Sequence, residues 1–264
     1  MLKKLFDFYI RSSIHVSLAV VALTVMTCLL LELPLDQNLL LFVFLSSVVG
    51  YNYAKYPDCF LDKKQLKKPK AILWLSVFCA FGAVFFFFTL NTKAQIAVVV
   101  TGLLTLFYVF PLFNFRNLSG VKIYIVALCW VIFTLLLPVF QAGFELNSDV
   151  FLKCMQRFLL IIILILIFEI IDLKEDNPEL KTVPQTIGVK NTKILGIILL
   201  CLFYGIEFFV FSHKVSQFLP NGILAVIIIL FLLFASEKKS KYYTTFWVES
   251  LPMLWLWLTV WLSN

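Results

Sequence analysis

Three acidic residues near the end of a long apolar stretch have the clearest chemical potential in this chain. Glu169, Asp172 and Asp176 are spaced i, i+3 and i+7, so on a helix they share one face, with neighbours about 5–6 Å apart between Cβ atoms. Carboxylates this close repel one another and take up protons unless a cation lies between them. Mg²⁺ commonly uses one or two protein carboxylates and completes its coordination with water and phosphate oxygens. The spacing therefore predicts a Mg²⁺ site that could hold a diphosphate.

A solvated helix end is the alternative interpretation of these acids. Lys174 and Lys181 follow them closely in the sequence and could neutralise them without a metal. Spacing alone leaves both interpretations open.

The composition places this candidate site in a membrane protein. Of the 264 residues, 62% are apolar, 14% are charged and 29 are Phe, with a mean hydropathy of +0.98, whereas an ordinary soluble chain is roughly 45–50% apolar and about 25% charged. A run of about 20 apolar residues forms a helix long enough to cross the hydrocarbon core. We expect an all-α, polytopic membrane protein in which residues 1–264 form a single bundle of nine transmembrane helices. The predicted spans are 13–33, 37–56, 71–90, 94–112, 119–140, 150–172, 192–212, 218–236 and 243–262.

The distribution of Lys and Arg predicts the orientation of the bundle, because inner loops of membrane proteins carry an excess of these residues. With the N-terminus inside, Lys93 and Lys214 are the basic residues of the outer segments, and Lys153 and Arg157 lie at the start of the sixth span. The others fall in inner segments. We therefore expect the N-terminus inside, the C-terminus outside and a multi-pass location such as the bacterial inner membrane. The net charge of +7 reflects this asymmetry and indicates no nucleic-acid partner.

The acidic segment continues into Lys-Thr-x-Pro-x-x-x-Gly at 181–188, and the combination resembles the UbiA family of intramembrane prenyltransferases. The second motif of that family reads D-x-x-D-x-x-x-D followed by K/R-T-x-P-x-x-x-G. The stretch 108–112, Tyr-Val-Phe-Pro-Leu, is similar to the family's Tyr-Ser-x-Pro-Leu-Lys-Arg. The resemblance implies that the carboxylates hold Mg²⁺ against the diphosphate of an isoprenoid donor, inside a bundle that also encloses an acceptor, often a phenol or quinone precursor.

The chain departs from the family at its first motif, N-D-x-x-D-x-x-x-D, which should end the second span. Only Asn52 matches there. Aromatic side chains take the positions of the three acids: Tyr53, Tyr56 and Phe60. Asp58 and Asp62 could substitute for them only if the helix continued beyond Pro57, and a proline tends to end or kink a helix.

Two functions follow for the inner face. In the first, the protein transfers a prenyl group from an isoprenyl diphosphate to an aromatic or quinone-precursor acceptor at the inner leaflet, with Asp172 and Asp176 catalytic through the metal and Glu169 supporting them. The residues expected to bind substrate are Asn52, Lys55, Tyr108, Arg116, Lys122 and Lys181. In the second, the bundle is a non-catalytic membrane subunit that binds lipid or a partner protein.

Four further polar residues lie within the predicted spans. Intramembrane charges usually pair, and Arg157 and Glu207 lie at similar depths in the sixth and seventh spans, so we expect an ion pair between them. A carboxylate-binding role for Arg157 is the alternative. His15 is expected to be a hydrogen-bonded packing residue, and Glu249 is expected to face the inner side of the bundle.

Overall fold

The computed structural model describes residues 2–56, 70–109, 120–210 and 217–262, and this part of the chain is mostly helical and contains no strand. Each predicted apolar span corresponds to a helix or to a run of consecutive helical segments. The main helices are α1 Leu2–Arg11, α2 Ile14–Leu30, α3 Gln37–Lys55, α5 Lys70–Phe87, α6 Thr92–Val109, α7 Lys122–Val131, α8 Leu137–Gln141, α9 Ser148–Asp172, α10 Val183–Ile206, α11 Phe218–Phe234 and α12 Leu251–Leu262. Short segments of other helix types complete them: the π-helices η3 Ile132–Leu136 and η6 Tyr243–Val248, and the 3₁₀ helices η4 Pro178–Leu180 and η5 Glu207–Phe209.

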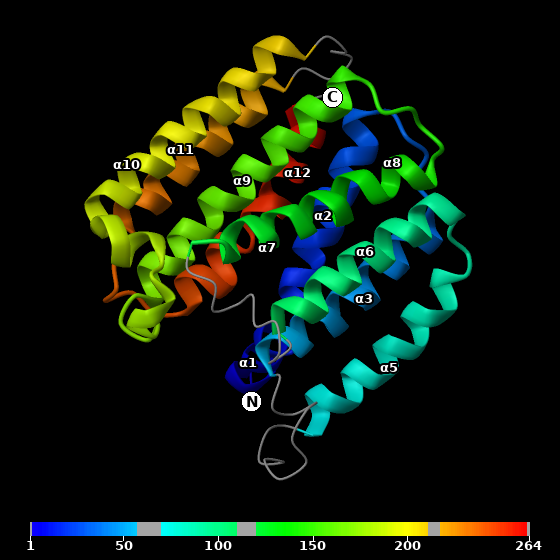
Figure 1. The fold of residues 1–264 in the computed structure, drawn as a ribbon, viewed down its shortest axis with the longest axis horizontal. Helices are drawn as coiled ribbons and strands as arrows, with labels where there is room; N and C mark the ends of the chain where they lie inside the picture. Colours follow the sequence, from blue (N-terminus) through cyan, green and yellow to red (C-terminus); the bar gives the residue numbers. More distant parts are fainter. Residues whose placement is uncertain (1, 57–69, 110–119, 211–216, 263–264) are drawn as a thin grey trace.

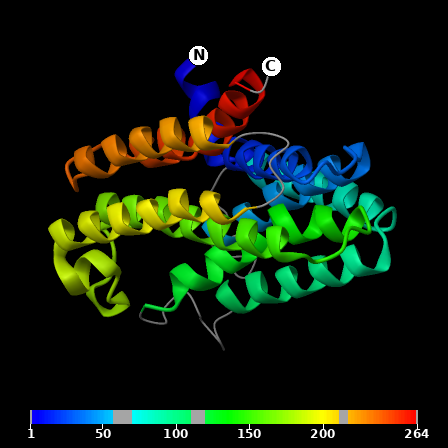
Figure 2. The same cartoon turned by 90° about the horizontal axis from the view of Figure 1, so that it is seen from above.

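The helices pack as a closed bundle (Figure 1). Contacts join α2 to α3, α3 to α6, α6 to α7, α7 to α9, α9 to α10, α10 to α11, α11 to α12, and α12 back to α2. Helix α5 packs against α3. Figure 2 shows that most helices run side by side across the view, in layers stacked along the shortest axis of the molecule. Segments from the two ends of the chain therefore become neighbours, which brings distant polar residues within reach of one another.

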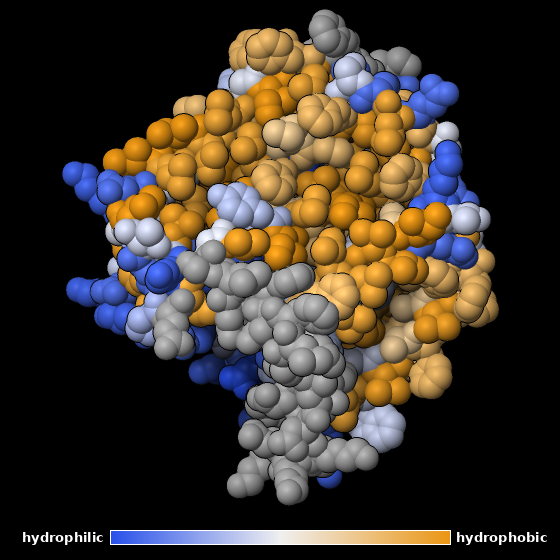
Figure 3. Space-filling view, viewed as in Figure 1, coloured by the Kyte–Doolittle hydropathy of each residue, from blue (hydrophilic) through white to orange (hydrophobic). Residues whose placement is uncertain are grey.

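Membrane character is clear from the surface as well as from the helices. Four described segments are long and apolar enough to cross a membrane: 70–87, 122–141, 148–172 and 183–209. A fifth is added if α1 and α2, which are bent by 55°, form one span. Large apolar side chains are exposed along α5, among them Trp74, Phe78 and Phe81, and apolar side chains cover most of the face in Figure 3. The chain is thus an integral membrane protein, and nine crossings with the N-terminus inside remain a prediction.

Helix α9, which crosses the centre of the bundle (Figure 1), is the most buried of the four long apolar segments. It begins where the Asn147 side chain accepts a hydrogen bond from the backbone N–H of Val150 at 3.0 Å, as expected of an N-cap residue. Its middle is filled by Ile163, Leu166 and Ile167, which have no exposed surface. Polar side chains are therefore confined to its two ends, and both ends carry a polar cluster.

The predicted span 13–33 corresponds to the continuous helix α2, and the chain bends directly before this helix. Ser13 lies at the bend, and its φ of 63° is in the left-handed region. Both Ser12 and Ser13 are fully buried at this bend. The short helix α1 consequently leaves the axis of α2 by 55° and packs its aromatic residue Phe6 against Tyr242 and Phe246 near the end of the chain.

Candidate functional site

The acidic cluster lies where α9 ends. The sequence placed all three acids on one helix, but α9 ends at Asp172, and the chain then makes a turn in which the backbone N–H of Asp176 donates to the carbonyl of Asp172 at 2.9 Å. Asp172 and Asp176 are half-buried. The carboxylate of Asp172 makes no hydrogen bond or ion pair within the described parts of the chain, so it is available to a cation.

Glu169 is occupied in a different way. Its side chain is 4% exposed, and its Oε1 forms an ion pair with Lys122 Nζ at 3.1 Å. Its Oε2 accepts the backbone N–H of Val183 at 3.0 Å. Because Val183 is the first residue of α10, Glu169 places a negative charge at a helix N-terminus, where the helix dipole favours it. Glu169 thus joins the starts of α7 and α10 to the end of α9.

Lys122 also approaches Asp176, at 4.0 Å from Oδ2. The predicted substrate-binding residue Lys122 is therefore brought to the acidic cluster, although it precedes Glu169 by 47 positions in the sequence. On the solvent side of the same end, Lys241 bonds to Glu175. This hydrogen bond to Glu175 raises the pKa of the Lys241 ammonium above its usual value.

The segment that resembles the family's Lys-Thr-x-Pro-x-x-x-Gly motif forms the start of α10. Thr182 is the N-cap residue, and its backbone N–H donates to Oε1 of Gln185 at 2.9 Å. Pro184 lies at the second helical position, where a missing N–H costs nothing. Gly188 has a φ of 78°, which glycine adopts at little cost. The side chain of Lys181, predicted to bind substrate, is exposed.

The other predicted substrate-binding residues are less closely assembled. Asn52 is completely buried and donates from Nδ2 to Ser76 Oγ at 2.9 Å, while its Oδ1 has no hydrogen-bond partner within the described residues. Lys55 is exposed at the end of α3, and Tyr108 is half-buried near the end of α6. Arg116, together with the alternative acids Asp58 and Asp62, lies outside the described residues.

No group of three or more His, Cys, Asp and Glu side chains in the described ranges is arranged to hold a metal ion. The three acids of the sequence pattern are thus not assembled as one ligand set, because Glu169 turns to Lys122 and to α10. Asp172 and Asp176 remain as a pair of half-buried carboxylates. Two carboxylates satisfy the usual protein contribution to a Mg²⁺ site, so Asp172 and Asp176 are the residues that would hold such an ion, while Glu169 is engaged with Lys122 and Val183.

The expectation for His15 is confirmed. Its Nε2 lies 2.9 Å from the carbonyl oxygen of Phe246, and its Nδ1 lies 2.8 Å from the hydroxyl of Tyr9. A carbonyl only accepts, so Nε2 carries the proton and donates it, while Nδ1 accepts from Tyr9. His15 is 2% exposed and links α2 to η6, the π-helix that ends directly before Glu249.

The predicted ion pair between Arg157 and Glu207 is wrong. Glu207 Oε2 instead pairs with Lys153 Nζ at 2.8 Å and accepts hydrogen bonds from Gln156 at 2.9 Å and Asn221 at 3.1 Å. Lys153 lies one helical turn before Arg157 on α9, and its ammonium group, not the guanidinium of Arg157, contacts Glu207. Arg157 turns to neutral groups on α2 and η3. Sequence reasoning missed Gln156 and Asn221, although polar residues inside apolar spans are a recognised signal of buried networks.

The fold and these polar clusters define a class of protein: a helical membrane bundle with an acidic cluster where its central helix ends. The chain shares its fold with a solved structure described as digeranylgeranylglyceryl phosphate synthase, at 13% sequence identity and a TM-score of 0.59, covering 98% of each chain. Likeness at this identity shows the fold alone. No protein-family model and no curated protein sequence matches the chain.

Proposed function

We propose that this protein transfers a prenyl group from an isoprenyl diphosphate to an acceptor at the membrane. The observation that carries the proposal is a cation, Lys122, held by Glu169 at 3.1 Å and lying 4.0 Å from Asp176, next to the unengaged carboxylate of Asp172 in a bundle of this fold. The ion pair with Glu169 on α9 fixes the position of the Lys122 side chain, which comes from the start of α7. A diphosphate bound there would meet positive charge from Lys122 beside the two carboxylates Asp172 and Asp176.

Each residue has a separate task in this proposal. Asp172 and Asp176 would hold Mg²⁺, which supplies charge neutralisation for the departing diphosphate. Lys122 would add a point charge to a diphosphate oxygen, a role that suits an ammonium group. During transfer, the bond between the first prenyl carbon and the diphosphate oxygen breaks, that carbon bonds to the acceptor, and the acceptor loses a proton. Electrostatic stabilisation of the leaving group is the main requirement of such a step.

The acceptor is the finer part of the proposal. The resemblance of the motifs to the UbiA family supports an aromatic or quinone-precursor acceptor. The structural neighbour is a synthase whose named product is a prenylated glyceryl phosphate, so an alcohol is the competing acceptor class. Both classes need the same diphosphate site, and a panel of acceptors separates them.

A non-catalytic membrane subunit is the second candidate function. It is favoured by the loss of the first acidic motif, of which Asn52 alone remains, and by the engagement of Glu169 with Lys122. In this case Asp172 and Asp176 would be solvated acids at a helix end, and their neutralisation would leave the protein's properties unchanged.

Turnover by purified protein tests the proposal. The protein in lipid nanodiscs would be incubated with prenyl diphosphates of several lengths and with phenolic and glyceryl phosphate acceptors, with and without Mg²⁺, and released diphosphate would be measured. We expect Mg²⁺-dependent release that Asp172→Asn removes. Glu237→Gln is the matched control, because it neutralises a partly exposed acid that pairs with Lys174 at 3.3 Å. Absence of release from every combination would favour the subunit.

A further inference from the structure

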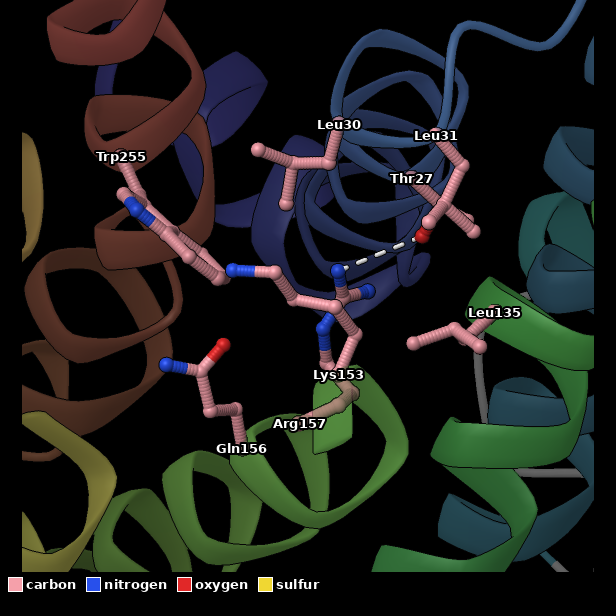
Figure 4. Close-up of a pocket in the computed structure, with 8 residues that line it drawn as sticks. All are labelled: Thr27, Leu30, Leu31, Leu135, Lys153, Gln156, Arg157 and Trp255. Carbon is pink, nitrogen blue, oxygen red and sulfur yellow. Dashed lines mark hydrogen bonds between the residues drawn. The ribbon is translucent and has the colours of Figure 1, made fainter. Parts of the chain in front are cut away.

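The second polar cluster of α9 surrounds a small cavity at the opposite end of the helix from Asp172. Arg157 precedes Asp172 by fifteen residues, or about 22 Å at the rise of an α-helix. Lys153, Gln156 and Arg157 line the cavity from α9, and Trp255 lines it from α12. Figure 4 shows these four side chains converging on the hollow from two sides.

Arg157 is buried without a partner of opposite charge. Its side chain is 2% exposed. Nη1 donates to the carbonyl of Leu23 at 3.1 Å and to Thr134 Oγ1 at 2.8 Å, and Nη2 donates to Thr27 Oγ1 at 3.3 Å. The guanidinium carbon lies 5.5 Å from the ring centre of Trp255. All of these groups are neutral, and Arg157 forms no ion pair with any described residue.

The carboxylate nearest in the network is already used. Glu207 receives Lys153, Gln156 and Asn221 on its Oε2, so one positive and one negative charge cancel there. Asp149 lies one helical turn before Lys153 on α9 and interacts electrostatically with it, but it lies eight residues before Arg157, which is about 12 Å along the axis. A guanidinium stays charged in proteins, and burying an uncompensated charge is costly. Arg157 therefore carries its positive charge beside the cavity with no described acid in contact with it.

Two buried polar atoms mark what the cavity could receive. Arg157 Nε is a donor without an acceptor, and Gln156 Oε1 is an acceptor without a donor, in the part of the chain that the structure describes. Buried polar groups are nearly always hydrogen-bonded. A ligand would satisfy both atoms if one of its oxygens accepted a hydrogen bond from Arg157 Nε and a neighbouring hydroxyl or water donated one to Gln156 Oε1. Lys153 contributes an ammonium group with three donors, of which the bond to Glu207 uses one.

The shape of the cavity sets the size of the ligand group. Its enclosed part has room for about one water molecule, and the hollow with its open mouth has an empty volume of about 240 Å³. Leu30 and Leu31, at the end of α2, line the cavity and are partly exposed. A single oxygen can therefore enter beside Arg157 while the rest of the ligand stays in an apolar mouth.

We propose that this cavity binds an oxyanion, through one phosphate oxygen placed between Arg157 Nε and Lys153. A lipid headgroup and free inorganic phosphate share this chemistry. The apolar mouth fits the lipid, whose chains would lie along Leu30 and Leu31, and a headgroup hydroxyl or its water would donate to Gln156. The site is separate from the diphosphate site at Asp172 and stands independently of the proposed prenyl transfer.

Native mass spectrometry of the purified protein tests this assignment. The protein would be titrated with phosphatidylglycerol, phosphatidylcholine and inorganic phosphate in separate arms. We expect retention of one phosphatidylglycerol with about tenfold preference over phosphatidylcholine, a difference of about 1.4 kcal/mol. Displacement of this lipid by millimolar inorganic phosphate would identify the free ion as the ligand, and its persistence would identify the headgroup.

Matched variants locate the binding. Arg157→Gln removes the buried charge and should abolish the preference. Lys93→Gln removes the same charge from an exposed position in the first turn of α6 and should leave the preference intact. Leu31→Trp narrows the mouth without touching the charges and should weaken retention, which covers the case in which Arg157→Gln fails to fold. Equal retention of the two lipids by the wild-type protein, or an unchanged preference in both cavity variants, would overturn the proposal.

Discussion

Lys122 at the start of α7 and Glu169 near the end of α9 form an ion pair of 3.1 Å whose acidic partner is 4% exposed. The pair fixes α7 against α9 and, through the bond from Glu169 to the backbone of Val183, α9 against α10. Three helices thus meet at one carboxylate, directly beside the two acids of the candidate site. The geometry of that site therefore depends on the ion pair between Lys122 and Glu169, which also holds the three helices together.

Lys122→Gln should lower the free energy of unfolding by about 3 kcal/mol, because it leaves a buried carboxylate without its counter-charge. Lys174→Gln is the control, since its pair with Glu237 is largely exposed, and such pairs contribute about 0–1 kcal/mol. The measurement is unfolding in a denaturing detergent titration. The double variant Lys122→Met/Glu169→Met should recover part of the loss. Equal effects of the two lysine variants would show that Glu169 is well solvated.

Mg²⁺ together with inorganic diphosphate should stabilise the folded protein, since a ligand that binds only the folded state adds about 2.7 kcal/mol at a hundred times its Kd. The readout is the thermal unfolding temperature, which does not require turnover. Asp172→Asn should remove the stabilisation, and Glu237→Gln should retain it. A chelator should return the wild-type protein to its unliganded unfolding temperature. An unshifted wild-type protein would remove the support for a metal at Asp172 and Asp176.

The sequence predicted the positions of the helices well because apolar runs separated by polar turns leave few alternatives in lipid. It did not predict the bend at Ser13 or the π-helices η3 and η6. These irregularities depend on tertiary partners: the carbonyl of Thr134 in η3 accepts from Thr27, and the carbonyl of Phe246 in η6 accepts from His15. Residues more than 100 positions away determine them, so no local pattern contains the information.

The candidate site was predicted in its residue types and only partly in its connections. Spacing on α9 correctly identified Glu169 and Asp172 as neighbours on one helix, but it could not show that Glu169 forms an ion pair with Lys122. Glu207 was assigned the wrong partner for a similar reason. Lys153 and Arg157 are one helical turn apart on α9, so the depth of Glu207 in the membrane does not distinguish between them. Pairing follows from the rotation of each helix about its axis, which the amino-acid pattern of a highly apolar helix leaves undetermined.

Close packing between α10 and α11 offers a test of the helix arrangement. A Cβ added to Gly196 would lie 2.9 Å from Cδ2 of Leu232, whereas one added to Gly205 on the same helix would meet nothing within 4 Å. Gly196→Ala should therefore cost about 1–3 kcal/mol through overpacking. Gly205→Ala should be neutral or stabilising by up to about 1 kcal/mol, because alanine restricts the unfolded chain and favours a helix. Detergent unfolding of both variants measures the difference, and equal stability would contradict the close contact.

Glu207→Gln should separate the two roles of the cluster around Arg157. Loss of the carboxylate leaves Lys153, whose side chain is 8% exposed, without its ion-pair partner, so the free energy of unfolding should fall by about 3 kcal/mol. Glu145→Gln, at an exposed position between α8 and α9, should change it by less than about 0.5 kcal/mol. Because the freed ammonium of Lys153 then faces the cavity, phosphatidylglycerol should bind Glu207→Gln more tightly than wild type and restore part of its stability. A variant that is destabilised but gains no affinity would show that Lys153 turns away from the cavity once Glu207 is neutral.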